Sequence, residues 1–253
     1  TSASPQVLRS VERMLTLDFF TSRRRLQLGD ISLISVKGET IAVDPTFAGL
    51  YHAYSPSENR GYTAQSFRAH VDDILNTSLY LNRAQHSWKG ELLVGNRYSR
   101  KDACRLLLWD TNQESTIYGY KVDMATSTCP IFVTYDKDPD VSASVRYLDE
   151  FHSPGLMKWY SRSKRTLQSN ELQPIIHHQV PLYLFVKKSD AEGTDYFYLG
   201  TADSSNPVQT TMRGDGSETH DVVTMDLKLE SPVELGLYQY LVDTGKVPTK
   251  GEH

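Results

Sequence analysis

Cysteine and long hydrophobic runs are what this sequence lacks most clearly. Cys104 and Cys129 are its two cysteines in 253 residues, which is too few for a disulfide scaffold or a zinc cage. We therefore expect both to be small buried side chains in a reducing cytoplasm. No apolar run approaches the roughly 20 residues needed to span a bilayer, and residues 1–5 lack the features of a secretory signal. These absences predict a cytoplasmic protein without a membrane partner.

Motifs of two large enzyme classes are also missing. The chain has no Gly-x-x-x-x-Gly-Lys-Ser/Thr loop for cradling phosphates, and no His-x-Lys-x-x-x-x-Asp pattern of phospholipase-D-type nucleases. We therefore expect this chain to contain neither a nucleotide-driven motor nor that nuclease. The main prediction is a non-catalytic protein with no catalytic residues, no metal and no cofactor.

One catalytic alternative remains open. Asp226-Leu227-Lys228 mimics the acidic-x-Lys signature of metal-dependent nucleases, with Asp221 or Asp140 as a second carboxylate. Two carboxylates and a lysine could hold Mg²⁺ and an attacking water. Such a triplet arises easily by chance in a charged surface strand, so a nuclease using Asp226 and Lys228 is the alternative hypothesis.

The net charge of −4 hides an uneven distribution along the chain. Counting Lys and Arg against Asp and Glu, residues 1–90 carry +2, residues 91–185 are neutral and residues 186–253 carry −6. Because the C-terminal part supplies the acidity, local basic clusters matter more than the total for the partners that the protein attracts.

Residues 1–90 have the pattern of a small helical domain. Ser4-Pro5 starts a helix, and a second helix begins at Thr63. Residues 31–36 and 40–43 flank a Lys-Gly-Glu turn, which predicts a β-hairpin. We expect a winged-helix-like domain whose boundary lies within residues 82–90. The residues expected on the buried face of the second helix are Phe67, Val71, Ile74, Leu75 and Leu79.

Residues 91–253 change to short strands separated by polar turns. The predicted fold class is therefore α+β, with the small helical part followed by a curved β-sheet or barrel. The expected strands are residues 106–109, 116–122, 129–135, 180–186, 196–199 and 222–229.

Two basic clusters carry the chemistry of DNA-backbone binding. Residues 158–166 contain four cations, two aromatic rings and three hydroxyl groups without an acid, and residues 96–102 have a similar mixture. Cations neutralise phosphates, and hydroxyl groups donate to phosphate oxygens. A loop leading into a helix near Ser99 is the competing interpretation of the second cluster, because Ser99 and Asp102 have capping-box spacing. The candidate backbone contacts are Arg97, Tyr98, Ser99, Arg100, Lys101, Lys158, Ser161, Arg162, Ser163, Lys164 and Arg165.

Aromatic residues near these clusters provide candidates for a base pocket. In a strand, both rings of Tyr118-Gly119-Tyr120 would project to one face, and the glycine would leave room for a flat ligand. Trp109-Asp110 places a carboxylate beside a ring, and a ring plus an acceptor is what a pocket for an extruded cytosine needs. Core packing competes for each ring, because strand aromatics are usually core. The candidate pocket residues are Trp109, Asp110, Tyr118, Tyr120, Tyr135 and Trp159.

Several motifs also occur in an order that resembles a known family. They are Tyr98-Ser99-Arg100-Lys101-Asp102-Ala103-Cys104, Leu108-Trp109, Ile117-Tyr118-Gly119-Tyr120, Cys129-Pro130-Ile131-Phe132-Val133-Thr134-Tyr135, Trp159-Tyr160-Ser161-Arg162-Ser163, Leu184-Phe185-Val186-Lys187-Lys188-Ser189-Asp190 and Tyr196-Phe197-Tyr198-Leu199-Gly200. Over about residues 91–230 they resemble a domain of uncharacterised function at the C-terminal end of bacterial DEAD-box helicases fused to phospholipase-D-type nucleases. SauUSI-like, modification-dependent (type IV) restriction enzymes have this arrangement.

The resemblance implies a role in bacterial defence. It implies that this region is the DNA target-recognition part, similar to SRA/PUA-like domains that flip and read 5-methylcytosine. It implies that residues 91–253 bind double-stranded DNA carrying 5-methyl- or 5-hydroxymethylcytosine. The implied partners are nuclease and helicase domains of the same or a partner chain. A protein-docking or dimerisation module of a helicase is a third hypothesis.

Overall fold

The computed structural model describes residues 4–20, 32–38, 40–53, 63–85, 91–136, 149–213 and 218–243. It divides into two compact units, Thr1–Leu92 with Cys104–Gln113, and Leu93–Ala103 with Glu114–His253. The domain boundary between residues 90 and 91 stays a prediction. Among the described helices, none is long and apolar enough to cross a membrane.

The first unit contains helices and one hairpin. Its elements are α1 (Pro5–Leu15), β1 (Ile34–Lys37), β2 (Thr40–Val43), α3 (Pro45–His52) and α4 (Thr63–Gln85). The side chain of Ser4 accepts from the Val7 N–H at 3.3 Å, which caps α1 as expected. Strands β1 and β2 pair antiparallel from Ile34 with Val43. The predicted first helix and hairpin are therefore confirmed.

The buried face predicted for α4 is wrong along much of the helix. Ile74 is 63% exposed, and Leu75 and Leu79 are exposed as well. Helix α3, which the sequence pattern did not predict, packs on α4 through the rings of Phe47 and Phe67, 5.9 Å apart. Since α3 has eight residues and α4 has 23, α3 covers only a part of α4.

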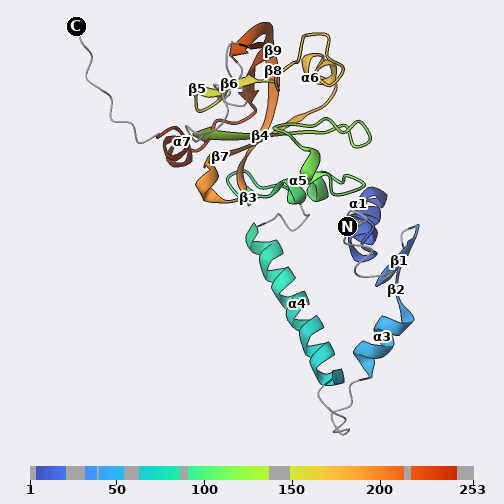
Figure 1. The fold of residues 1–253 in the computed structure, drawn as a ribbon. Coiled ribbons are helices and arrows are strands. Elements are labelled where there is room, and N and C mark those ends of the chain that lie inside the picture. Colours follow the sequence, from blue (N-terminus) through green and yellow to red (C-terminus); the bar gives the residue numbers. More distant parts are fainter. Residues whose placement is uncertain are drawn as a thin grey trace, which may run out of the picture. The chain divides into compact units, whose positions relative to one another are not determined.

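Seven strands of the second unit form one mixed sheet. They are β3 (Arg97–Tyr98), β4 (Cys129–Asp136), β5 (Glu150–Ser153), β6 (Leu156–Tyr160), β7 (Leu182–Ser189), β8 (Tyr196–Arg213) and β9 (Thr219–Leu229). The order is β4-β7-β8-β9-β6-β5, and β3 pairs with β8. β4 and β7 are parallel, whereas the other pairs are antiparallel. Figure 1 shows β8 and β9 as the long strands of this sheet.

The sheet is curled, because side chains from its two ends meet. β4 and β5 lie at opposite ends of the strand order, yet the rings of Tyr135 and Phe151 on these strands stack at 5.8 Å. Tyr120, which bridges to Ile131 of β4, packs edge to face on Trp159 of β6 at 5.0 Å. The predicted α+β fold class with a curved sheet is confirmed.

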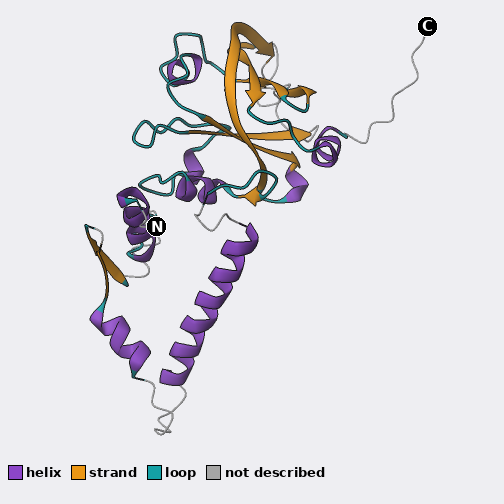
Figure 2. Cartoon of the chain, turned by 180° about the vertical axis from the view of Figure 1, so that it is seen from behind, coloured by secondary structure: helices purple, strands orange, loops and turns teal. Residues whose placement is uncertain are grey.

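Alternating side chains fill both faces of this sheet. Ile131 of β4 and Leu184 of β7 belong to the aliphatic core, whereas their neighbours Phe132 and Phe185 stack with each other at 4.7 Å. This two-residue period places both faces in contact with other side chains. Helix α6 (Gln173–Ile176) packs against β8 and α7 (Leu235–Val242) against β7, at the margins of the sheet (Figure 2).

Several predicted strands of this region differ from the structure. Leu106 is the last residue of α5 (Arg100–Leu106), and residues 107–109 belong to no strand. Residues 116–122 contain the end of a 3₁₀ turn and isolated bridges. The capping-box interpretation is confirmed, because Ser99 Oγ accepts from the Asp102 N–H at 3.1 Å and Asp102 Oδ2 accepts from the Ser99 N–H at 3.2 Å. A helix therefore starts at Arg100, as this interpretation expected, and it ends at Leu106, the first residue of the predicted strand.

The burial of β7 leads to a stability prediction. Leu184→Ala should lower the free energy of unfolding by about 2–5 kcal/mol, because the side chain is fully enclosed and its removal leaves a cavity. Leu235→Ala makes the same change at an exposed position and should cost less than about 0.5 kcal/mol. Denaturant titrations followed by circular dichroism compare the two. Equal losses would contradict the packing of β7.

Candidate nucleic-acid interface

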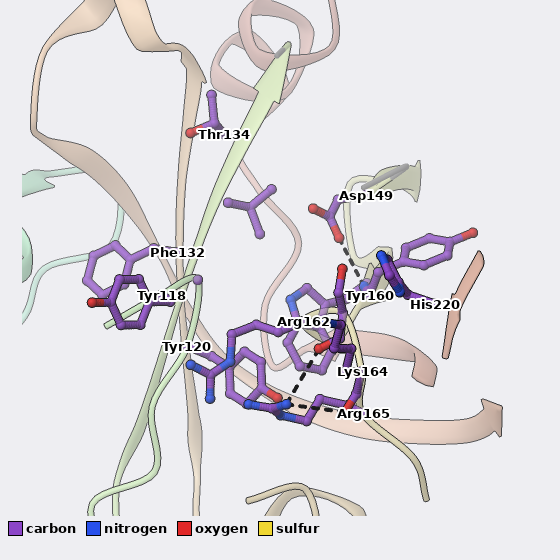
Figure 3. Close-up of a pocket in the computed structure, with 14 residues that line it drawn as sticks. Tyr118, Tyr120, Phe132, Thr134, Asp149, Tyr160, Arg162, Lys164, Arg165 and His220 are labelled. Atoms are coloured by element: carbon purple, nitrogen blue, oxygen red, sulfur yellow. Dashed lines mark hydrogen bonds between the residues drawn. The ribbon is translucent and has the colours of Figure 1, made fainter. Parts of the chain in front are cut away.

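A pocket of about 580 Å³ opens where the two ends of the curled sheet approach each other. Val133 and Thr134 of β4 line one wall, and Trp159 and Tyr160 of β6 line the other. Figure 3 shows Asp149, Tyr160 and His220 across from Tyr118 and Phe132, with the arginine side chains between them. The pocket therefore lies in the gap between the two ends of the curled sheet, which we call the seam.

One wall depends on a tight bend at Gly119. This glycine has a φ of 81°, a left-handed conformation that favours glycine over other residues. Its carbonyl accepts from the Phe132 N–H at 2.6 Å, which fastens the bend to β4. Tyr118 and Tyr120 bridge each other across the bend. Tyr118 is 65% exposed, whereas Tyr120 is 1% exposed. The two rings thus differ in exposure, in contrast to the shared strand face that the sequence predicted.

Four side chains form a hydrogen-bonded group at the base of the pocket. Tyr120 donates its hydroxyl to Glu171 Oε1 at 2.5 Å. Arg165 Nε donates to the same oxygen at 2.5 Å, and Arg162 donates to Oε2 at 2.5 Å. The guanidinium of Arg162 also lies over the Tyr120 ring, 5.0 Å from its centroid. One carboxylate therefore holds a ring and two cations together.

The pKa values of this group follow from burial and pairing. Burial, followed by the hydrogen bond to Glu171, raises the pKa of Tyr120 far above its ordinary range. Burial alone would raise the pKa of Glu171, but hydrogen bonds from Arg165 and Tyr120 and the charge of Arg162 outweigh it and lower that pKa. The hydrogen bond to Glu171 raises the pKa of Arg165. The group therefore has a neutral phenol, one carboxylate and two guanidinium ions at neutral pH.

Asp149 and His220 supply polar groups on the opposite wall. Asp149 Oδ1 accepts from the Tyr160 N–H at 3.0 Å, just before β5 begins (Figure 3). A carboxylate has two oxygens that accept hydrogen bonds, and Asp149 places this group at the pocket. His220 of β9 faces the same space.

The loop after β6 brings cations to the pocket. Ser161 is fully buried, and its Oγ accepts from the Val223 N–H at 2.9 Å. The Arg165 N–H donates to the Asp221 carbonyl at 3.1 Å, so the loop runs along the edge of β9. Lys164 between them has a φ of 62°, a strained conformation for a residue with a side chain, and it is exposed. The loop therefore presents its cations beside the pocket.

The predicted pocket residues are divided between several places. Tyr118, Tyr120 and Trp159 line the pocket. Tyr135 instead stacks on Phe151. Trp109 is 1% exposed within the first unit, where Asp110 forms an ion pair with Arg13. Trp109, Asp110 and Tyr135 are thus not among the residues that line the pocket.

The predicted backbone contacts of residues 158–165 are only partly brought together. Arg162, Ser163, Lys164 and Arg165 line the pocket. Lys158 pairs with Asp226 at 3.5 Å, on a different part of the sheet surface. Because Ser161 is buried and bonded internally, its hydroxyl cannot reach a phosphate in this conformation.

The second cluster lies apart from the pocket lining. Arg97 pairs with Glu192 at 3.1 Å and lies over the Phe197 ring at 4.4 Å. Arg100 donates to the Tyr196 hydroxyl at 3.0 Å. Tyr98 is buried, Ser99 caps α5 and Lys101 is exposed on that helix. These side chains are mostly engaged with the protein itself.

Sequence reasoning missed three polar residues that the fold gathers here. Asp149, Glu171 and His220 are far apart in the chain and belong to no motif. A signal was present for Glu171, which is the first acid after the cation-rich segment and lies six residues beyond Arg165. For Asp149 and His220 we find no comparable signal, because strand order brings these two residues to the pocket.

The nuclease alternative finds no support in the contacts of Asp226. Its Oδ2 accepts from Asn206 at 2.8 Å, and its other oxygen pairs with Lys158. Asp140 lies outside the described residues. Within the described ranges, no group of three or more His, Cys, Asp or Glu side chains could hold a metal ion.

Comparison with solved structures finds proteins of low sequence identity. One is KRYPTONITE in complex with mCHH DNA, an H3(1-15) peptide and SAH, with 16% identity and a TM-score of 0.36, covering 56% of this chain and 33% of that one. Another is the DNA modification-dependent restriction endonuclease AspBHI, with 13% identity and a TM-score of 0.40, covering 57% and 43%. A third is the MspJI restriction endonuclease with a 27-mer oligonucleotide, with 12% identity and a TM-score of 0.31, covering 44% and 31%. The aligned part thus spans less than half of each of these proteins.

Comparison with protein families gives two matches along the chain. Residues 1–87 match a domain of unknown function, DUF8090. Residues 92–241 match a domain of unknown function, DUF3427, on the stretch where the sequence motifs occur. No curated protein matches the chain in sequence. Because the second match covers more than half of its 253 residues, the chain belongs to the DUF3427 family.

Proposed function

We propose that this chain is a DNA target-recognition module that reads 5-methyl- or 5-hydroxymethylcytosine in duplex DNA by base flipping. The observation that carries the proposal is the pocket at the seam of the sheet. It combines aromatic rings, a carboxylate and the cations Arg162, Lys164 and Arg165 in about 580 Å³. The module would act with nuclease and helicase domains, of the same or a partner chain, in a restriction enzyme.

Aromatic rings supply the stacking that an extruded base requires. Flipping a base costs a few kcal/mol, and stacking on an aromatic side chain returns roughly 1–3 kcal/mol. Tyr118 is exposed at the pocket, and Tyr160 is half-buried on the opposite wall. Since stacking is similar for every base, discrimination must come from hydrogen bonds and from contacts to the modification.

Asp149 is the acceptor that we assign to the exocyclic amine of cytosine. The sequence suggested Asp110 for this role, but Asp149 is the carboxylate that lines the pocket. The hydrogen bond from the Tyr160 N–H to Asp149 Oδ1 orients this carboxylate. An acceptor at this position favours a base that presents an N–H donor to it.

Cations beside the pocket are suited to the phosphates that flank the flipped nucleotide. Lys164 is exposed, and Arg162 and Arg165 line the pocket from the same loop. Phosphate contacts position a protein on DNA without reading its sequence. The overall charge of −4 does not oppose this arrangement, because the field near a site depends on its local charges.

A panel of duplexes tests the proposed function. The chain should bind duplexes with 5-methyl- or 5-hydroxymethylcytosine at least about tenfold more tightly than the plain duplex, the scale of one well-placed contact to a base. Fluorescence anisotropy at fixed salt measures the three affinities. Equal affinity for all three duplexes would contradict recognition of the modification. Absence of binding to every duplex would contradict DNA binding itself.

Asp149→Asn tests the acceptor. The amide keeps an oxygen for the Tyr160 N–H but places a donor opposite the cytosine amine, so affinity for the modified duplex should fall about tenfold or more. Affinity for plain DNA, which we expect to depend mainly on contacts to the DNA backbone, should change little. Asp203→Asn makes the same change at an exposed position of β8 and serves as the control. Unchanged discrimination in the Asp149 variant would exclude this residue as the reader.

Lys164→Ala tests the phosphate contact. Affinity for all duplexes should weaken alike, and the slope of log K against log salt should become shallower by about one unit. Lys228→Ala removes the same charge from an exposed position of β9 that does not line the pocket. Anisotropy titrations at four salt concentrations give both slopes. A Lys164 variant with the parental slope would take Lys164 out of the interface.

A further inference from the structure

Glu171 has an unusual position relative to the pocket. It is not one of the residues that line the pocket, yet it contacts three residues that do: Tyr120, Arg162 and Arg165. Its own side chain lines a neighbouring cavity of about 470 Å³, which shares Tyr118, Tyr120 and Arg162 with the pocket. Glu171 therefore acts on the pocket through other side chains.

The backbone around Glu171 holds its carboxylate in place. The next residue, Leu172, is fully buried, and its N–H donates to the Ser169 carbonyl at 2.8 Å. Helix α6 follows at Gln173. Both oxygens of Glu171 are in use, Oε1 by Tyr120 and Arg165 and Oε2 by Arg162. Such a shared carboxylate fixes both the directions and the separations of its partners.

The charges of this group do not cancel. Two guanidinium ions and one carboxylate leave one net positive charge beside the pocket, where two would remain without Glu171. A guanidinium that is already bonded to a carboxylate also has fewer N–H groups for a phosphate. Glu171 thus reduces the attraction for any DNA backbone while it orders the base of the pocket.

We propose that Glu171 is a positioning residue that makes binding selective. By fixing the positions of the Tyr120 ring and the Arg162 guanidinium relative to each other, Glu171 keeps the pocket in a shape that accepts the flipped base. By pairing with Arg162 and Arg165, it restrains their contact with phosphates of unmodified DNA. This inference rests on the proposed function, because it concerns how the same pocket discriminates.

Glu171→Gln is the variant that tests this inference. It keeps the size of the side chain but removes its charge. Plain duplex should bind more tightly, and the salt slope should steepen by about one unit because a cation is released for phosphate contact. The ratio of affinities for modified and plain duplexes should fall about tenfold, as expected for loss of hydrogen bonds to a charged group. The opposite signs of these changes separate positioning from simple loss of fold.

Glu230→Gln is the matched control. Glu230 is exposed and accepts from the Thr201 hydroxyl, and it has no contact with the pocket cations among the described residues. The Glu230→Gln variant should retain the parental salt slope and the parental ratio of affinities for modified and plain duplexes. If Glu171→Gln also retained both, or lowered only the melting temperature, Glu171 would be a structural residue and the inference would be overturned.

Two further measurements keep the inference testable whatever the first variant does. Tyr120→Phe removes one hydrogen bond without changing charge, so the affinity ratio should fall while the salt slope stays constant. Without DNA, side-chain NMR of Arg162 and Arg165 should show ordered guanidinium N–H signals that are lost in Glu171→Gln. Failure of DNA binding with this NMR result would overturn the proposed function alone. Unchanged NMR signals in the variant would overturn the role of Glu171.

Discussion

Edge-to-face packing of Tyr120 on Trp159 joins parts of the sheet that are distant in strand order. Tyr120 bridges to β4 at one end of the sheet, and Trp159 belongs to β6 near the other, with ring centroids 5.0 Å apart. Tyr135 and Phe151 make a second such contact. These ring contacts stabilise the curled shape of the sheet, while side chains keep the strands at its two ends apart. A concave site results, whose walls come from two strands and whose base comes from a loop.

Electrostatics at this site depends on pairing more than on composition. The chain is acidic overall, yet the loop after β6 carries cations beside a pocket with few acids. Two of these cations share the carboxylate of Glu171, so they are ordered before any ligand arrives. Order of this kind reduces the entropy lost on binding, and it directs charge toward particular atoms of a ligand. Lys164, held on a strained backbone in the same loop, is exposed to solvent.

Local patterns predicted the elements that have strong alternation or a capping signal. β9 contains the alternating residues 222–229, β4 and β7 contain two of the predicted strands, and α1 begins at Pro5 after the Ser4 cap. β5 and β6 were missed because strands of four and five residues contain too little alternation to recognise. Residues 106–109 have strand propensity but form no strand, because the helix capped by Ser99 and Asp102 continues to Leu106 and a turn follows it. A defined cap can outweigh propensity over a few residues.

For the site, the sequence by itself determined which kinds of chemistry are present: the cations of residues 162–165 and the rings of Tyr118, Tyr120 and Trp159. Only the tertiary structure decided which acids meet them. Asp110, adjacent to a tryptophan in the chain, pairs with Arg13, whereas Asp149 and Glu171 reach the pocket region. The physical reason is that ligand geometry depends on contacts between residues far apart in sequence. Strand order and the curl of the sheet create these contacts, and no local spacing encodes them.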